Sequence, residues 1–221
     1  MLKSLLSTSA ALLASGLLAS GASIFAPGDT IFGGQINGDN FEVGVSGTAA
    51  GVNNWPGGEP PEAAIDGAGQ KYLNFGKTNT GIVITPASGS SIAQSLHLWT
   101  ANDAEPRDPS GYQVWGSNAA LGAGPFAVSD FTPISVGSLS LPSSRNGGGG
   151  AALDPANQVT IGFANSTAYS SYMIIFPDVK DNGAANSMQI AEIQLDTAIP
   201  EPGVASFLLL GVGALAFRRR R

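Results

Sequence analysis

The stretch LWTANDAEPRDPSGYQVWGSN, residues 98–118, holds the pattern that decides the fold. It starts within one β-prone run, SLHLWT at 95–100, and ends with another, GYQVWGS at 111–117. The residues between them, ANDAEPRDPS, are mostly small, polar or proline, a composition typical of turns and loops. Two short strands joined by a polar loop are therefore predicted here.

The same pattern continues in both directions, and no segment of the middle has the 3.6-residue periodicity of an amphipathic helix. Further β-prone runs are FEVGVSG at 41–47, GIVIT at 81–85, FTPISV at 131–136, QVTIGF at 158–163, SYMIIF at 171–176 and QIAEIQL at 189–195. Gly, Pro, Asn, Asp and Ser separate them, which predicts an all-β sandwich. The glycine run at 147–150 is short enough to be a loop within one domain, residues 24–198.

The N-terminal end has the composition of a signal peptide. Lys3 supplies a positive charge, Leu5 to Leu18 is an apolar run too short to span a bilayer well, and residues 19–23, ASGAS, are small. Residues 1–23 are therefore predicted to be a signal-peptide helix that signal peptidase removes. The chain has no cysteine, so the exported domain must be stable without disulfides.

The C-terminal end, IPEPGVASFLLLGVGALAFRRRR at 199–221, is a second segment outside the domain. The tail begins with Pro200, Glu201 and Pro202, through which a helix cannot continue toward the domain. The uncharged run 204–217 that follows predicts a short transmembrane helix. At 1.5 Å per residue this run spans roughly 21 Å, against about 30 Å of hydrocarbon. It could be an ordinary tail anchor or a processed signal, and its shortness favours the signal.

The tail closes with the basic residues Arg218, Arg219, Arg220 and Arg221, a block that resists translocation. The order Pro-Glu-Pro, apolar helix, arginine cluster resembles the PEP-CTERM sorting signal of Gram-negative bacteria. This resemblance implies cleavage near the Pro-Glu-Pro by exosortase, a membrane protease-transpeptidase, and an association with exopolysaccharide and biofilm. It also implies transient inner-membrane contact, followed by display at the cell surface or in the extracellular matrix.

Between the two ends the chain is acidic. Lys3 and the four terminal arginines are five of ten basic residues, and Glu201 is one of sixteen acidic ones. Five basic and fifteen acidic side chains remain, a net charge of −10. This balance argues against nucleic acid and anionic lipid as partners.

Three stretches carry a second resemblance: PEAAIDGAGQKYLNF at 61–75, the stretch 98–118, and SMQIAEIQL at 187–195. Together they resemble the discoidin-like (F5/8 type C, galactose-binding-like) jelly roll, from about residue 53 to residue 196. The resemblance implies a non-catalytic module that binds carbohydrate, with extracellular polysaccharide as its partner. A structural matrix protein without a specific ligand is the alternative, and a glycan-cleaving enzyme is a third hypothesis.

The discoidin-like resemblance also implies a structural Ca²⁺ ion held by Asp66, Gln70 and Glu192. Oxygen ligands from distant segments suit this ion, which would join the first and last parts of the domain. Two features argue against it. Gln70 stands where the family has a hydroxyl residue, and alternation in QIAEIQL places Glu192 on the polar face, where a solvated glutamate would also lie.

The loop at 101–110 offers ligand-binding side chains. Arg107 could hold a sugar hydroxyl or carboxylate, with Asp103 and Glu105 accepting hydrogen bonds from hydroxyls. The alternative is that Arg107 pairs with Asp108 and fixes the loop. Trp55, in the loop NNWPGG, is the tryptophan best placed to stack on a sugar, because a tryptophan within a sandwich strand usually belongs to the core.

Catalysis has little support in the sequence. His97 is the only histidine and lies within a predicted strand, so a Ser-His-Asp triad would have to be built there. Asp103, Glu105 or Asp108 could supply the carboxylate pair of a glycosidase, but the sequence does not set their spacing. A non-catalytic protein is therefore predicted.

Overall fold

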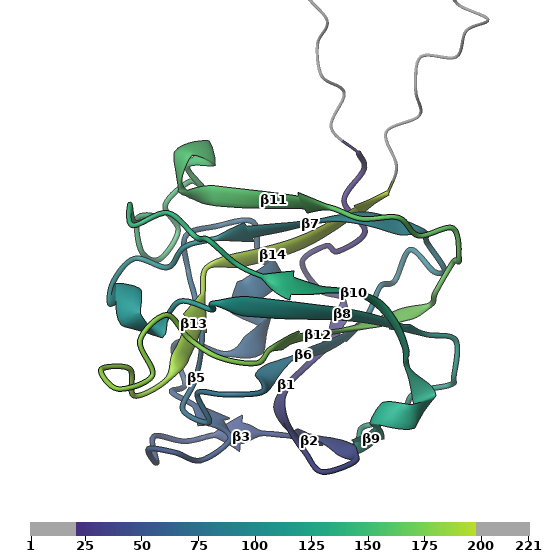
Figure 1. Cartoon of the computed structure of the whole chain (residues 1–221), viewed down its shortest axis with the longest axis horizontal. Helices are drawn as coiled ribbons and strands as arrows, with labels where there is room; N and C mark the ends of the chain where they lie inside the picture. The colour runs from purple at the N-terminus through teal and green to yellow at the C-terminus, as the bar shows by residue number, and fades with distance from the viewer. Residues whose placement is uncertain (1–20, 198–221) are drawn as a thin grey trace, which may run out of the picture.

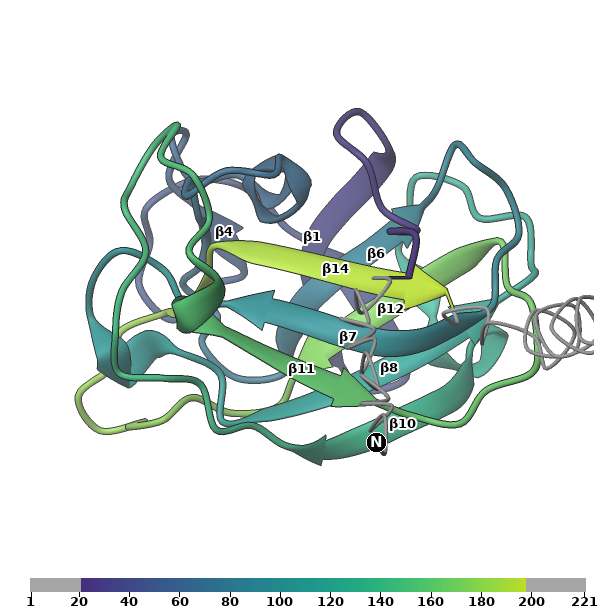
Figure 2. The same cartoon turned by 90° about the horizontal axis from the view of Figure 1, so that it is seen from above.

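The computed structural model describes residues 21–197, and these form a β-sandwich (Figures 1 and 2). The strands are β1 (Thr30–Asn37), β2 (Asn40–Val43), β3 (Val45–Ser46), β4 (Asn54–Trp55), β5 (Tyr72–Asn74), β6 (Thr80–Thr85), β7 (Ala93–Trp99), β8 (Gly111–Ser117), β9 (Phe126–Ala127), β10 (Thr132–Ser138), β11 (Gln158–Gly162), β12 (Ser171–Phe176), β13 (Met188–Ile190) and β14 (Glu192–Thr197). Four short 3-10 helices accompany them: η1 (Pro61–Ile65), η2 (Glu105–Arg107), η3 (Val128–Asp130) and η4 (Pro155–Asn157).

Most of the predicted leader and the whole predicted sorting tail lie outside the described residues. The predicted transmembrane helix and the residues Pro200, Glu201, Pro202, Arg218, Arg219, Arg220 and Arg221 are all in that tail. Within residues 21–197, no helix has the length and apolar character needed to cross a bilayer.

Two antiparallel sheets form the layers. The larger has the strand order β10-β8-β12-β6-β1-β2-β9, and the smaller has the order β11-β7-β14. Figure 2 shows the three-stranded sheet lying across the seven-stranded one. Two small pairs, antiparallel β13-β5 and parallel β3-β4, lie beside them.

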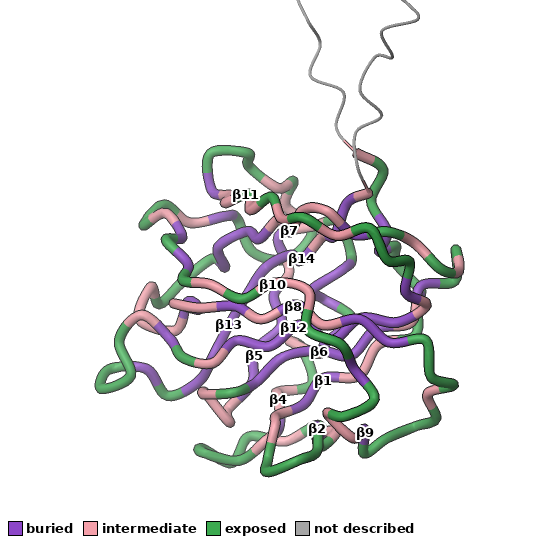
Figure 3. The backbone as a smooth tube through the Cα atoms, turned by 45° about the vertical axis from the view of Figure 1, so that its right-hand side comes forward, coloured by how far each residue is buried: buried purple, intermediate pink, exposed green. Residues whose placement is uncertain are grey.

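The main core fills the space between the two sheets, where apolar side chains of alternating strand positions meet. Figure 3 shows the buried stretches of the backbone along these strands. Its fully buried members include Ile82, Ile84, Val114, Tyr172 and Ile174 from the larger sheet and Leu96, Leu98, Ile193 and Leu195 from the smaller. A second apolar cluster involves the other positions of the same strands, Val83, Met173 and Ile175, with Phe126 and Phe131. Strand β12 is therefore buried on both faces, which explains why SYMIIF is apolar without alternation.

The all-β class predicted from the sequence is confirmed, and β8 and β12 have the predicted bounds or nearly so. The central strand β1 is not predictable from its composition, because TIFGGQIN contains two glycines that weaken a strand. The structure explains them: a Cβ on Gly33 would lie 2.4 Å from a Pro61 carbon, and one on Gly34 would lie 2.3 Å from the Glu42 carbonyl oxygen. Helix η1 and strand β2 therefore pack directly against the β1 backbone.

Candidate functional site: the charged loop end

One end of the sandwich gathers the connections that carry three of the five lysine and arginine side chains of residues 21–197. We call it the loop end and define it by residues 100–110, 139–157 and 177–187 (Figure 1). Backbone hydrogen bonds join the three segments: Leu139 N–H donates to the Ser110 carbonyl at 2.8 Å, and Lys180 N–H donates to the Asp108 carbonyl at 2.8 Å. The loop predicted to bind ligand is thus held on two sides by segments distant in sequence.

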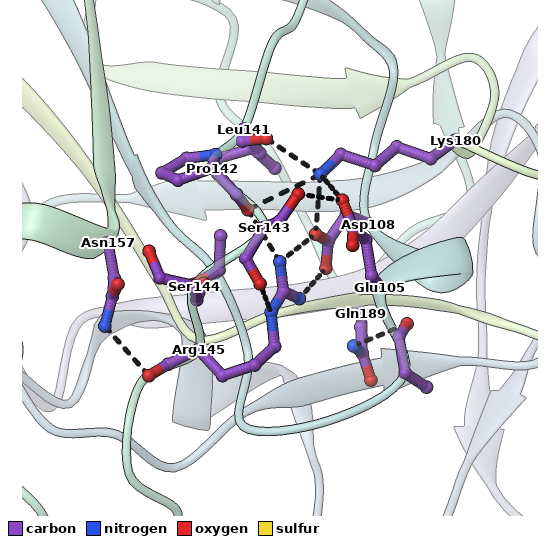
Figure 4. Close-up of polar contacts among 12 residues, drawn as sticks. Glu105, Asp108, Leu141, Pro142, Ser143, Ser144, Arg145, Asn157, Lys180 and Gln189 are labelled. Carbon is purple, nitrogen blue, oxygen red and sulfur yellow. Dashed lines mark hydrogen bonds and ion pairs between the residues drawn. The ribbon is translucent and has the colours of Figure 1, made fainter.

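Asp108 is the centre of an ion-pair network at this end (Figure 4). Its side chain is 0% exposed and accepts two parallel hydrogen bonds from Arg145, Nη1 to Oδ1 at 2.8 Å and Nη2 to Oδ2 at 2.7 Å. Lys180 Nζ lies 3.3 Å from Asp108 Oδ2 and also donates to Glu105 Oε1 at 2.9 Å. A bidentate arginine and a lysine thus neutralise a buried carboxylate and its half-exposed neighbour.

The sequence-based alternative, a pair between Arg107 and Asp108, is wrong. Asp108 pairs with Arg145 and Lys180 instead. The Arg107 guanidinium has one ion pair among the described residues, Nη1 to Asp103 Oδ2 at 3.9 Å. Its side chain is 25% exposed, and that of Asp103 is 48% exposed. Arg107 therefore lies at the rim of the loop end, with only a distant carboxylate beside it.

The Asp103 carboxylate is paired with a buried lysine. Lys71, directly before β5, is 5% exposed and donates to Asp103 Oδ1 at 2.7 Å; its Nζ also lies 3.4 Å from Glu59 Oε1. Gln189, on β13, donates to the Asp103 carbonyl at 2.6 Å. The β5-β13 pair thus supports the rim from the interior.

Trp55 lies close to this end but is not a free platform. The indole is half-buried, packs against the main core and meets the ring of Tyr72 edge-on, with centroids 6.0 Å apart. Four residues after Trp55, the Glu59 carboxylate lies 3.4 Å from Lys71, the lysine that pairs with Asp103 at the rim. One face of the ring is therefore committed to the core.

The predicted calcium ligands are only partly brought together. Glu192 is 2% exposed, so an ordinary solvated glutamate at this position is excluded. Its Oε2 accepts from Gly67 N–H at 3.1 Å. Burial raises the pKa of Glu192 to about 8, and the charge of Asp66 acts in the same direction. Gln70, by contrast, directs its side-chain nitrogen to the Gly58 carbonyl.

No group of three or more His, Cys, Asp or Glu side chains within residues 21–197 is arranged to hold a metal. A cation at Asp66 and Glu192 would therefore need backbone carbonyl ligands as well, which Ca²⁺ accepts readily. The donor set fits that ion because both carboxylates are hard oxygen ligands and Glu192 has no ion pair among the described residues.

His97 lies on the outer face of the smaller sheet, and its contacts do not form a catalytic triad. Asp196 Oδ2 lies 3.3 Å and Ser95 Oγ 3.1 Å from the same ring nitrogen, Nε2. Nδ1 is instead within 2.6 Å of the Gln158 amide nitrogen and 3.0 Å of Thr160 Oγ1. A triad needs the carboxylate on one nitrogen and the serine on the other.

Three residues that matter most at this end, Lys71, Arg145 and Lys180, are not among the predicted site residues. Each comes from a segment far from the loop in sequence, so no local motif marks it. A signal exists nevertheless: they are three of only five basic residues between the two ends of an acidic chain. Asking which carboxylates these few cations neutralise would point to the 101–110 loop.

No protein-family model matches the sequence, and no curated protein matches it. Among solved structures, the CBM32-1, CBM32-2 and M60 catalytic domains of Clostridium perfringens ZmpB give a TM-score of 0.50, with 15% identity over 80% of this chain and 15% of that chain. The family 32 module of C. perfringens NanJ, in complex with galactose, gives 0.49 with 12% identity over 78% of this chain and 96% of that chain. The family 32 carbohydrate-binding module of Streptococcus pneumoniae EndoD gives 0.49 with 11% identity over 80% and 100%.

At such identities the similarity concerns the fold alone. The discoidin-like sandwich expected from three short stretches of sequence is confirmed at this level. The chain spans a small part of the ZmpB polypeptide, so nothing of that protein's chemistry transfers with the fold.

Proposed function

We propose that this chain is an exported, non-catalytic carbohydrate-binding module whose ligand contacts the rim of the loop end. The supporting observation is the way Arg107 and Asp103 are presented. They are partly exposed, yet the loop that carries them is fixed by two ion pairs, that of buried Asp108 with Arg145 and that of Asp103 with buried Lys71. A few polar groups on a rigid scaffold are what sugar hydroxyls require for recognition.

The electrostatics of Glu105 argue against the glycan-cleaving alternative. A glycosidase needs one carboxylic acid with a raised pKa. The hydrogen bonds from Ser143 and Lys180 lower the pKa of Glu105. Asp108 is buried beneath its two cations, and Asp103 is paired with Lys71, so none of the three is placed as a proton donor to a sugar.

Retention in native gels containing polysaccharide tests this proposal, with exopolysaccharide from a biofilm-forming Gram-negative host and galactose-rich polymers as probes. We expect retarded migration, and loss of the retardation in Arg107→Ala. Lys77→Ala is the matched control, because Lys77 is a cation whose Nζ, among residues 21–197, donates to the Asn182 carbonyl at 2.7 Å and has no ion pair. Absence of retardation with every polymer would favour the structural matrix protein, whose deletion should reduce biofilm cohesion.

For the cell address, we propose that residues 199–221 are read by an exosortase-type enzyme after export and transient inner-membrane contact. The order Pro-Glu-Pro, apolar run, arginine block supports this. The C-terminal mass of protein found outside the inner membrane is the test. An end near Pro200–Pro202, or an adduct there, agrees with sorting to the surface or matrix, whereas an intact chain confined to inner membrane indicates a tail anchor.

For the ion, we propose that Asp66 and Glu192 hold a structural Ca²⁺, with Gln70 as a further predicted ligand. The burial of Glu192 beside a second carboxylate supports this, because a cation would stabilise both charges. The ion's contribution would be to join the segment after η1 to the last strand.

A further inference from the structure

The first described residues pair with the last strand and complete the smaller sheet. Ile24 N–H donates to the Leu195 carbonyl at 2.7 Å, and Thr197 N–H donates to the Ala22 carbonyl at 3.1 Å. Ser23 lies opposite Asp196 in an antiparallel bridge. Residues 22–24 therefore occupy the edge of β14 that β7 leaves open.

The two residues at the end of this segment belong to the core. Ile24 is 3% and Phe25 6% exposed, and the Phe25 ring meets Tyr172 edge-on at 6.0 Å. Truncating a buried phenylalanine typically costs about 3–5 kcal/mol of stability. Residues 22 and 23, which composition assigns to the leader, are thus part of the folded edge of the domain.

The small residues ASGAS at 19–23 allow more than one signal-peptidase cut, because the enzyme needs small residues one and three positions before the bond. Cuts after Gly21, Ala22 or Ser23 all meet this requirement. Only the first of them leaves the Ala22 carbonyl in place as the acceptor for Thr197. A cut after Ala22 or Ser23 removes that acceptor and leaves the Thr197 N–H at the sheet edge without it.

We propose that the leader is cleaved at the Gly21–Ala22 bond, so that Ala22 is the first residue of the exported protein. Water adds across the peptide bond: its hydroxyl goes to the Gly21 carbonyl carbon and its hydrogen to the Ala22 nitrogen. The new terminus lies next to the end of β14, and Figure 1 shows the two described ends of the chain side by side. Leader and sorting tail would thus both leave from one edge of the domain. The inference rests on the export part of the proposed function and is independent of sugar binding.

The register of the smaller sheet places this edge away from the loop end. Trp99 pairs with Glu192 where β7 enters the 100–110 loop, whereas Ala93 pairs with Thr197 at the opposite end of the same strands. Processing at both termini would therefore leave the rim around Arg107 untouched.

The test is the intact mass and N-terminal peptide of the full chain, expressed in an exporting Gram-negative host and collected outside the inner membrane. We expect a first residue at Ala22. A first residue at any other position overturns the proposal, and a chain beginning at Met1 would also overturn export itself.

Two matched variants locate the bond independently. Gly21→Gln puts a large residue directly before the proposed bond and should abolish the Ala22 terminus. Ser23→Gln lies two residues beyond it and should leave that terminus in place. Loss of cleavage in both variants would place the cut after Ser23, because Gly21 then stands three positions before the bond. Unchanged cleavage in both would place it after Ala22. Glycan retention of the same preparations reports separately on sugar binding, so the two ideas can fail independently.

Discussion

Asp108 and Glu192 are both buried carboxylates, and the chain provides for them in opposite ways. Asp108, 0% exposed, has Arg145 and Lys180 beside it. Within the described part of the chain, Glu192, 2% exposed, has as partners only the Gly67 N–H at 3.1 Å and the Gln194 amide at 3.3 Å. The first charge is neutralised within the protein, whereas the second needs a proton or a cation from solution.

This difference gives the two sites different dependence on solution conditions. The Asp108 network takes both of its cations from the protein, and one of them is an arginine, which stays charged at all accessible pH values. It therefore joins the loops without an ion from solution. Burial raises the pKa of Glu192 from an ordinary value of 4.5 to about 8, so this carboxyl loses its proton slightly above neutral pH and not in the acid range. The Asp108 network is therefore expected to keep its contacts without calcium, and the Glu192 site to respond to pH and calcium.

The largest expected effect comes from Arg145→Ala, which breaks the self-contained pair. Among the described residues it leaves buried Asp108 with one cation, the lysine at 3.3 Å, and it removes the Arg145 hydrogen bonds to the Ser143 and Pro142 carbonyls. Removing one partner of a buried ion pair typically costs about 3–5 kcal/mol. Urea unfolding followed by circular dichroism measures this loss, with Lys77→Ala as a control expected within about 0.5 kcal/mol of wild type. A loss below about 1 kcal/mol for Arg145→Ala would contradict the role given to the network.

The second prediction concerns pH in the presence of EDTA. Between pH 4.5 and 8 the unfolded chain has released the Glu192 proton while the folded chain keeps it, so rising pH favours unfolding. We expect the free energy of unfolding to fall over this window by an amount on the order of 2–4 kcal/mol. Glu192→Gln cannot titrate and should remove most of this slope. An unchanged slope in the variant would mean that other groups cause it.

The contrast between these residues also shows what the sequence could and could not reveal. Asp103, Glu105 and Arg107 lie within five residues of sequence, so their gathering in one loop could be predicted. Their cations could not, because Lys71, Arg145 and Lys180 are brought in by tertiary pairing.

Local patterns likewise succeeded for strands such as β8, GYQVWGS, whose packing is reflected in alternation. They failed where tertiary contact determines the residue. The glycines of β1 are explained only by the approach of Pro61 and Glu42. For Glu192, alternation correctly places the side chain opposite Ile193, but it cannot show that the 66–70 loop covers that position.

The third prediction adds calcium to the same comparison. At pH 8 and at 100 times the dissociation constant, bound Ca²⁺ should stabilise the domain by about 2.7 kcal/mol. The gain should shrink toward pH 5, because the ligand carboxylates must lose their protons before they bind. Thermal unfolding with and without calcium at the two pH values measures this. Asp66→Asn should lose the gain, while Asp178→Asn, a change at a distant carboxylate, should keep it. No calcium effect on wild type at pH 8 would leave Glu192 as a buried protonated acid.

The smallest expected effect on stability is that of Arg107→Ala, and it separates binding from folding at the loop end. The Arg107–Asp103 distance of 3.9 Å and the exposure of both side chains describe a surface pair, which contributes about 0–1 kcal/mol. We therefore expect unfolding within about 0.5 kcal/mol of wild type, together with at least a tenfold loss of affinity for the retained polysaccharide. Arg145 and Arg107 would then be two arginines of one loop end with separate roles, the first in folding and the second in recognition. If Arg107→Ala instead destabilises the domain by more than 1 kcal/mol and leaves retention unchanged, the rim is structural and the sugar must be bound elsewhere on the sandwich.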